Sequence, residues 1–263
     1  MVRVESPSSI NTYNQCPRKY YYHYIEELPT TPSIHLVRGN IVHTVLEEFF
    51  DIDDKIKTQD DLQVHLFWLL EKVWNENQSR LLELGLDEKK LAVYYEDSRK
   101  MLQNWLGRFR RKLKIQVKDG MTFDQAFESL TPIREQEFVS EKYKVRGFID
   151  AMFEKNGNTV ILDYKTSKRN HLSPEYRLQL GIYALMYLEK TGKLPAIVGI
   201  DFLAHNEVLV PVDEKLIDHA KEEVTRMHKK TVSKEKKHYP KKPSPLCKWS
   251  TGQCDYYDKC FKY

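Results

Sequence analysis

The stretch 144–168, KVRGFIDAMFEKNGNTVILDYKTSK, contains two runs of β-branched, aromatic and aliphatic residues that are separated by Asn156-Gly157. An Asn-Gly pair between such runs is a strong hairpin signal, because both turn positions need a positive φ. The stretch therefore predicts two antiparallel strands, 145–154 and 159–164, that are joined by a tight turn.

This turn decides which side chains face each other across the hairpin. If Asn156 and Gly157 occupy the turn positions, Asp150 lies opposite Asp163, and Lys165 shares the face of Asp163. Opposed Cβ atoms are about 4.5–5.5 Å apart, where like charges are destabilising. A divalent metal or a raised pKa would compensate, and a solvent-exposed hairpin is the alternative. With Lys165 nearby, a metal-dependent hydrolytic site is the sharper hypothesis.

Composition places the chain among soluble globular proteins. Its 263 residues are 30% charged and 41% hydrophobic, with a net charge of +4. No apolar run approaches the roughly 20 residues that cross a bilayer, and the N-terminus lacks a signal-peptide core. We therefore expect a cytoplasmic protein without a membrane partner. The net charge alone does not identify a nucleic-acid binder.

Three of the four cysteines crowd the C-terminus, while Cys16 stands alone near the start; the other three are Cys247, Cys254 and Cys260. In a reducing cytoplasm, metal ligation is a more plausible use of these thiols than disulfides. Four thiolates suffice for tetrahedral zinc or an iron–sulfur cluster, either of which would join the two termini. The alternative is that Cys16 is a buried apolar residue unrelated to the others.

Helical periodicity dominates the first half of the chain. Residues 39–50 show an apolar side at three- and four-residue spacing, with His43 and Glu47 four residues apart on one face. Residues 60–118 indicate two long helices with a break near 85–87. We interpret residues 51–130 as an all-α insertion between the His43 helix and the strands.

Two basic segments are candidates for contact with nucleic-acid phosphates. Arg18 and Lys19 precede a tyrosine-rich run, YYYHY, and Arg108, Arg110 and Arg111 lie near the end of the second long helix. Cations interleaved with aromatic rings suit single-strand binding. The alternatives are that the tyrosines cover the core and that the arginines form a solvated helix end, which the dipole favours.

The remaining elements indicate an α/β fold. A strand at 133–140 precedes the hairpin, where Glu137 could project towards the acids, and a helix from Pro174 with Ser173 as its cap follows. Strands are expected at 196–204 and 207–212, which gives a mixed sheet with helices on both faces. Residues 221–242 carry nine Lys or Arg against three Glu and suggest a flexible basic linker or a phosphate-contacting arm.

Four short motifs and the four cysteines occur in an order that resembles that of a known protein family. GNIVH at 39–43, GFID at 147–150, DYKT at 163–166 and QLGIY at 179–183 follow one cysteine and precede three. This arrangement resembles the RecB-like branch of the PD-(D/E)XK nucleases, specifically members with an iron–sulfur cluster, such as CRISPR-adaptation exonucleases and the nuclease domains of helicase–nucleases. The resemblance spans residues 16–260 and implies a restriction-endonuclease-like core.

The resemblance assigns metal-site roles residue by residue. It implies that His43, Asp150 and Asp163 bind Mg²⁺ or Mn²⁺, with the Tyr164 carbonyl as a further ligand, and that Lys165 orients or activates the attacking water. Hard oxygen ligands with one imidazole suit these ions. The implied activity is metal-dependent hydrolysis of DNA phosphodiester bonds, most of all as an exonuclease on single-stranded or frayed ends.

Further implied roles lie on the helix beside the site and at the termini. Gln179 and Tyr183 would contact substrate or support the metal ligands, and the 4Fe-4S ligands would be Cys16, Cys247, Cys254 and Cys260. Six residues separate Cys247 from Cys254, where two are typical of the family, so zinc stays an alternative. The expected layout is one nuclease domain over 1–263, with a helical insertion at 51–130, a catalytic core at 131–212 and cluster-binding termini at 1–28 and 243–263.

Other functions remain open at this level. The first alternative is a structure- or end-specific endonuclease that trims DNA for a recombination, repair or CRISPR-adaptation complex. A non-catalytic DNA-binding scaffold is the second. The chain has no phosphate-cradling GxxxxGK[ST] motif, so any unwinding would come from a helicase partner.

Overall fold

The centre of the protein is a five-stranded mixed sheet in the order β1-β2-β3-β4-β5. The computed structural model describes residues 3–52, 56–155, 157–250 and 252–262. The strands are β1 Ile133–Ser140, β2 Val145–Lys155, β3 Asn158–Lys165, β4 Ile197–Phe202 and β5 Glu207–Pro211. Neighbours are antiparallel except β3 and β4, which are parallel. The predicted mixed sheet is confirmed.

The hairpin of β2 and β3 has the predicted register. Lys155 pairs with Asn158, and the pairing continues to Ala151 and Leu162, so the next opposed positions are 150 and 163. Gly157 has φ 76°, as a two-residue turn requires, while Asn156 lies outside the described residues. The turn therefore brings the two aspartates to corresponding positions on neighbouring strands.

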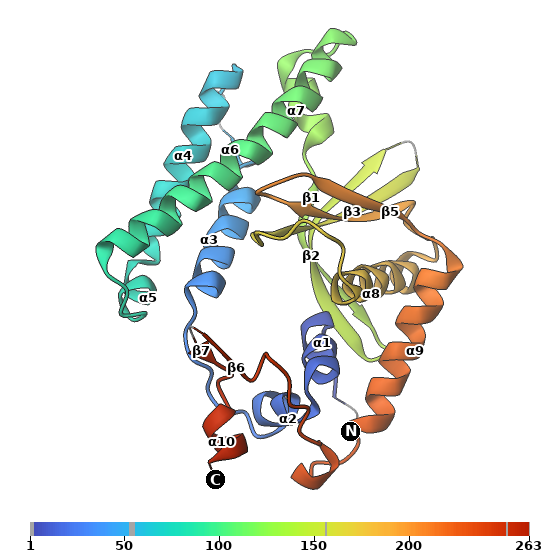
Figure 1. Ribbon diagram of the computed structural model, residues 1–263. Helices are drawn as coiled ribbons and strands as arrows, with labels where there is room; N and C mark the ends of the chain where they lie inside the picture. Colours follow the sequence, from blue (N-terminus) through green and yellow to red (C-terminus); the bar gives the residue numbers. More distant parts are fainter. Residues whose placement is uncertain (1–2, 53–55, 156, 251, 263) are drawn as a thin grey trace.

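Helix α8 Pro174–Thr191 covers one face of the sheet, and α9 Glu214–Lys230 packs against α8 on its outer side (Figure 1). The Ser173 side chain caps α8 by accepting the Tyr176 N–H, and Gly192, with φ 71°, ends the helix. Residues 221–230 belong to α9, so the prediction of a flexible linker is wrong for them, while phosphate contact by 221–242 stays a prediction. The apolar residues of α9 recur at helical spacing and face the core, while its basic residues occupy the outer side; the buried positions are Leu216, Ile217, Ala220, Val224 and Met227.

The opposite face of the sheet packs against α3 Ile34–Glu48 and the helical insertion. The insertion consists of α4 Gln59–Glu76, α5 Gln78–Leu82, α6 Glu88–Lys118 and α7 Phe123–Leu130, and Figure 1 shows α4 and α6 side by side. The predicted break falls between α5 and α6, where Asp87 caps α6. Sequence reasoning missed α7, although Thr122 and Gln125 form a capping box at its start.

The two ends of the chain lie together (Figure 1). The N-terminal part consists of α1 Pro7–Gln15, α2 Pro17–Tyr20 and the π-helical turn η1 Tyr21–Ile25. The C-terminal part consists of η2 Lys236–His238, β6 Lys248–Trp249, β7 Gly252–Gln253 and α10 Tyr257–Phe261. Hydrogen bonds from the first part to the second hold them together. The Tyr256 hydroxyl donates to the Leu28 carbonyl at 3.2 Å, which links the termini directly. Tyr20 and Tyr22 are buried, so the core interpretation holds for these two tyrosines.

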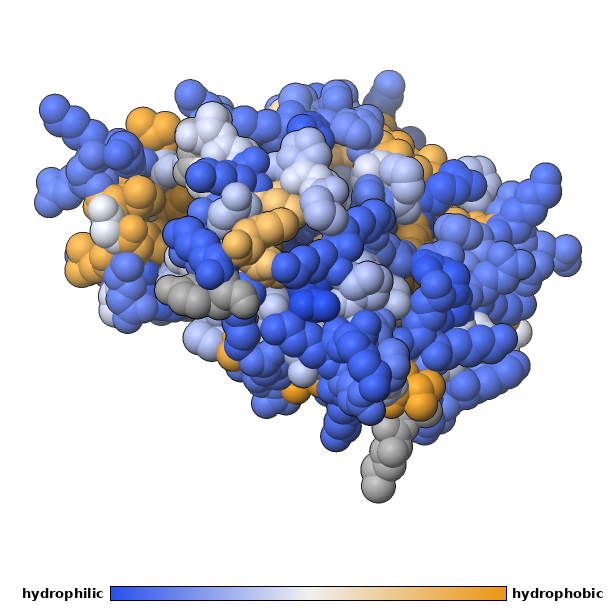
Figure 2. Space-filling model, turned by 60° about the horizontal axis from the view of Figure 1, so that its bottom comes forward, coloured by the Kyte–Doolittle hydropathy of each residue, from blue (hydrophilic) through white to orange (hydrophobic). Residues whose placement is uncertain are grey.

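The face of the molecule in Figure 2 is mainly hydrophilic. On the face shown in Figure 2, apolar residues form small separate patches between charged and polar ones. Within the described part of the chain, none of the helices combines the length and the apolar character that a membrane span needs.

Candidate active site

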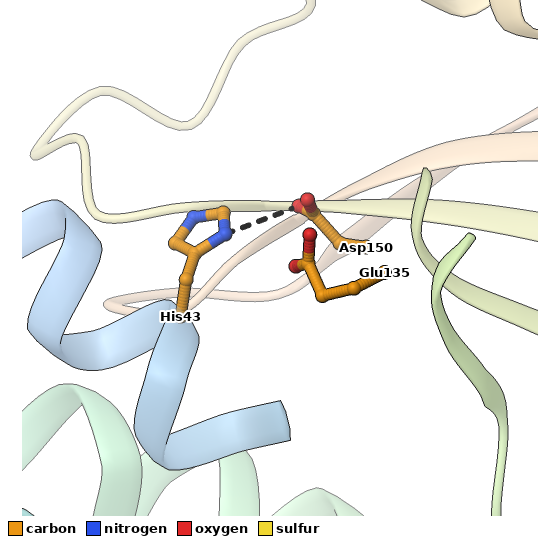
Figure 3. A group of neighbouring side chains, drawn as sticks. All are labelled: His43, Glu135 and Asp150. Carbon is orange, nitrogen blue, oxygen red and sulfur yellow. Dashed lines mark ion pairs between the residues drawn. The ribbon is translucent and has the colours of Figure 1, made fainter. Parts of the chain in front are cut away.

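Three side chains from three different elements form a group with metal-ligand chemistry. His43 on α3, Glu135 on β1 and Asp150 on β2 offer ligand atoms that all lie within 4.8 Å of one another. Figure 3 shows His43 pointing towards Asp150 with Glu135 beside them, and His43 Nδ1 lies 3.5 Å from Asp150 Oδ2. One imidazole and two carboxylates suit Mg²⁺ or Mn²⁺.

Glu135, and not Glu137, is the β1 acid in this group. Arg134 pairs with Ala151 and Gln136 with Ile149, which places Glu135 opposite Asp150, whereas Glu137 pairs with Phe148 and is exposed. Glu135 has φ 43°, a conformation that is uncommon for a residue with a side chain. Sequence reasoning therefore found an acid-bearing strand but chose the wrong acid, because the register between β1 and β2 is not set by a recognisable tight turn.

Asp150 and Asp163 are held differently. The Asp150 carboxylate accepts the Tyr164 N–H at 2.7 Å, so a side chain bridges β2 and β3 beyond the Ala151–Leu162 pair. Asp163 is 2% exposed, and Lys165 Nζ lies 2.5 Å from its Oδ2. The Lys165 ammonium therefore occupies this oxygen, and Asp163 lies next to, not within, the group of three ligand atoms that His43, Glu135 and Asp150 offer.

Helix α8 supplies the adjoining wall. Gln179 Nε2 donates to Asp163 Oδ1 at 2.7 Å and to the Tyr183 hydroxyl at 2.8 Å, and that hydroxyl lies 3.3 Å from the same carboxylate oxygen. Burial raises the pKa of Tyr183 well above its usual value, so the phenol remains a neutral donor. Both residues therefore fix Asp163 Oδ1 and leave Oδ2 towards Lys165.

Burial and neighbouring charges shift the pKa values of the titratable groups in the site. Burial, followed by the charge of Asp150, raises the pKa of Glu135 to about 7. Burial also raises the pKa of Asp163, although Lys165 opposes the shift. Burial lowers the pKa of His43, but the hydrogen bond and charge of Asp150 outweigh it and the net shift is upward. A divalent cation would displace these protons, because metal ligands bind in their deprotonated forms.

Tyr164 contributes its backbone to the site, while its side chain points elsewhere. The phenol is buried, and burial raises its pKa strongly, with the charge of Asp201 adding to the shift. Its N–H already binds Asp150, and its carbonyl stays a predicted ligand.

The five predicted phosphate-binding cations have different surroundings. Arg108 is buried, and its guanidinium binds the Asp201 carboxylate and the His205 carbonyl. Arg110 contacts the first turn of α4 through the Gln59 carbonyl and Gln63, whereas Arg111 is exposed. Arg108 is thus occupied by internal partners in this structure.

Arg18 and Lys19 lie where the N-terminal and C-terminal segments contact each other. Arg18 donates to the Tyr239 carbonyl at 2.7 Å, and Lys19 lines the cavity that contains the cysteines. Both remain predicted DNA contacts.

All four cysteines line one cavity between the termini: Cys16, Cys247, Cys254 and Cys260. Burial raises the pKa of both Cys254 and Cys260, and the charge of Cys16 contributes to both shifts. The isolated N-terminal thiol therefore lies close to thiols more than 200 positions later in the chain.

A mixed sheet that presents carboxylates and a lysine beside a helix-borne histidine defines a metal-dependent nuclease core. The chain belongs to the PD-(D/E)XK nuclease superfamily, whose family model matches residues 5–261. It is 28% identical to the Gene 69 protein of Mycobacterium phage L5 over 212 aligned residues. The alignment covers 70% of this chain and 70% of the phage protein. Its fold is similar to that of a candidate exonuclease from Eubacterium rectale, with a TM-score of 0.56 and 12% identity, over 94% of this chain and 86% of the other.

Proposed function

We propose that this nuclease is a DNA exonuclease that hydrolyses phosphodiester bonds at single-stranded or frayed ends with Mg²⁺ or Mn²⁺. The observation that carries the hydrolytic assignment is the buried Asp163–Lys165 pair beside the His43, Glu135 and Asp150 group. The DNA and exonuclease assignments rest on the motif resemblance described above.

Each residue has a role that follows from its contacts. Asp150, Asp163, Glu135 and His43 would hold the cation, which supplies electrophilic stabilisation of charge on the phosphate oxygens. The Lys165 ammonium, fixed by Asp163, orients the attacking water and stabilises negative charge that develops near it. Gln179 and Tyr183 are positioning residues, because they contact Asp163 rather than the reacting atoms.

The exonuclease proposal is tested by comparing linear and circular single-stranded DNA of the same sequence. We expect Mn²⁺-dependent degradation of the linear strand and survival of the circle, because an exonuclease needs an end. End labels on either side report polarity. Cleavage of the circle would instead support the endonuclease alternative, and metal-independent binding without turnover would support the scaffold alternative.

We also propose a 4Fe-4S cluster at the cysteine cavity. Support comes from the four thiols around one cavity, which bring Cys16 together with the three C-terminal cysteines. Tetrahedral zinc is the alternative for the same four thiolates.

Absorbance and metal content distinguish the two cofactors. We expect anaerobically purified protein to be brown, to contain about four irons per chain and to lose this colour in Cys254→Ser. A colourless protein with one zinc per chain would refute the cluster and leave the nuclease site unaffected.

A further inference from the structure

A second cationic cluster lies next to the active site, and Arg38 is its buried member. Arg38 is on α3, five residues before His43, and is 3% exposed. Its Nη2 donates to the Thr166 carbonyl at 3.0 Å, directly after Lys165. In the described part of the chain, its Nε and Nη1 have no hydrogen-bond partner. A buried guanidinium with two unused donors is costly unless it binds an anion at some stage of function.

Four further side chains lie around this guanidinium: Tyr94, Asp97, Lys168 and His35. The Tyr94 ring centroid is 5.6 Å from Arg38 Cζ. Asp97 Oδ2 lies 3.9 Å from both Arg38 Nη1 and Lys168 Nζ, which is beyond hydrogen-bond distance. Partial burial, followed by the charges of Arg38 and Lys168, lowers the pKa of His35. Two full positive charges therefore share one distant carboxylate, and the cluster has a net positive charge without a close ion pair.

The location of this cluster connects it with cleavage. Five residues along an α-helix correspond to a rise of about 7.5 Å and a rotation of about 140°, so Arg38 leaves α3 on a different side from His43 and reaches the site through the segment after Lys165. Through Thr166, the same guanidinium contacts the residue that follows Lys165. An anion at this position would lie close to the phosphate that is cleaved.

We propose that Arg38, Lys168 and His35 form a phosphate-binding site for the nucleic-acid strand beside the catalytic metal site, and that Asp97 occupies the anion position in the free protein. This inference rests on the nuclease function proposed above. An arginine presents several donors to phosphate oxygens, and a flexible lysine adds a second charge. The phosphate is either an internal phosphodiester or the terminal phosphate of a strand.

The effect of Asp97→Asn on DNA binding distinguishes phosphate binding by Arg38 from a purely structural role. If the carboxylate only ties α6 to α3 through Arg38, Asp97→Asn weakens that tie and does not improve DNA binding. If Asp97 competes with phosphate, Asp97→Asn removes the competitor and tightens binding. Both Asp97 and Lys168 are at least partly exposed, so their variants are expected to fold.

The test measures binding of a labelled single strand by anisotropy in an Asp163→Asn background. We expect Asp97→Asn to tighten binding about two- to fivefold and Lys168→Ala to weaken it about as much. Lys168→Ala also reduces the slope of log K against log salt by about 0.7. Lys90→Ala is the matched control, because it removes one exposed charge from α6 about two turns before Asp97, where Lys90 pairs with Asp87.

Oligonucleotides with a 5′-phosphate, a 3′-phosphate or hydroxyl ends distinguish the two phosphate sources. A loss with Lys168→Ala for one phosphorylated end alone identifies a terminal phosphate, and an equal loss for all ends identifies a phosphodiester. If the wild type cleaves DNA but Asp97→Asn does not tighten binding and Lys168→Ala matches Lys90→Ala, the phosphate site is wrong. If the wild type cleaves no nucleic acid, the proposed function itself is wrong.

Discussion

Asp163→Asn is expected to lower cleavage of single-stranded DNA by about a thousandfold or more, at saturating Mn²⁺. The substitution removes the charge that holds Lys165 and replaces one proposed metal-binding oxygen with an amide nitrogen. Folding should persist, because the asparagine carbonyl can still accept from Gln179 and because ionising a buried carboxyl is itself unfavourable. Single-turnover rates measure the loss, and thermal unfolding of both proteins checks the fold.

A pair of glutamate variants on β1 serves as the matched control. Glu135→Gln should reduce Mn²⁺ affinity by about tenfold or more, because one carboxylate leaves the group within 4.8 Å. Glu137→Gln, two residues along the same strand and exposed, should behave as wild type. Cleavage at the wild-type rate by Asp163→Asn, or equal effects of the two glutamate variants, would contradict the site described here.

The parts of the site that could be predicted depend on local signals. Asn156-Gly157 sets the register of β2 and β3, and that register alone places Asp150 and Asp163 at opposed positions. Ser173 and Gly192 mark both ends of α8, and helical spacing then puts Gln179 and Tyr183 on one side of it. In each case the determining residues lie within a few positions of the feature that they determine.

The parts that could not be predicted depend on contacts between distant segments or on unusual backbone. Glu135 joins His43 and Asp150 with a main-chain φ of 43°. Glutamate rarely adopts this conformation, so the sequence gives no reason to expect it there. Arg38 gains its surroundings from α6 and from the loop after β3. Arg108 is predicted to contact phosphate because it stands in a basic run. Its actual partner, Asp201, is 93 residues away in the sequence, so no local pattern indicates the ion pair.

Arg108→Met is expected to destabilise the protein by about 3–5 kcal/mol, as removal of one partner of a buried ion pair does. Arg108 joins α6 to β4 by binding the Asp201 carboxylate, which is 1% exposed, and to the next turn through the His205 carbonyl at 2.9 Å. Without the guanidinium, the charge of Asp201 is left buried and uncompensated. Urea unfolding at pH 8 measures the free energy of unfolding.

The pH dependence and a double variant distinguish this role from DNA binding. Burial already raises the pKa of Asp201 to about 6 even though Arg108 opposes the shift. Loss of Arg108 raises that pKa further, so the carboxyl stays neutral over a wider pH range and the destabilisation is smaller at pH 5 than at pH 8.

Arg108→Met with Asp201→Leu should recover most of the lost stability, because no buried charge remains. Arg111→Ala, on the exposed side of the same helix, should change stability by less than about 0.5 kcal/mol. If Arg108→Met unfolds like the wild type but binds DNA more weakly, Arg108 belongs to the nucleic-acid surface. The insertion is then joined to the sheet by apolar packing and by the contacts of Asn104 and Lys112.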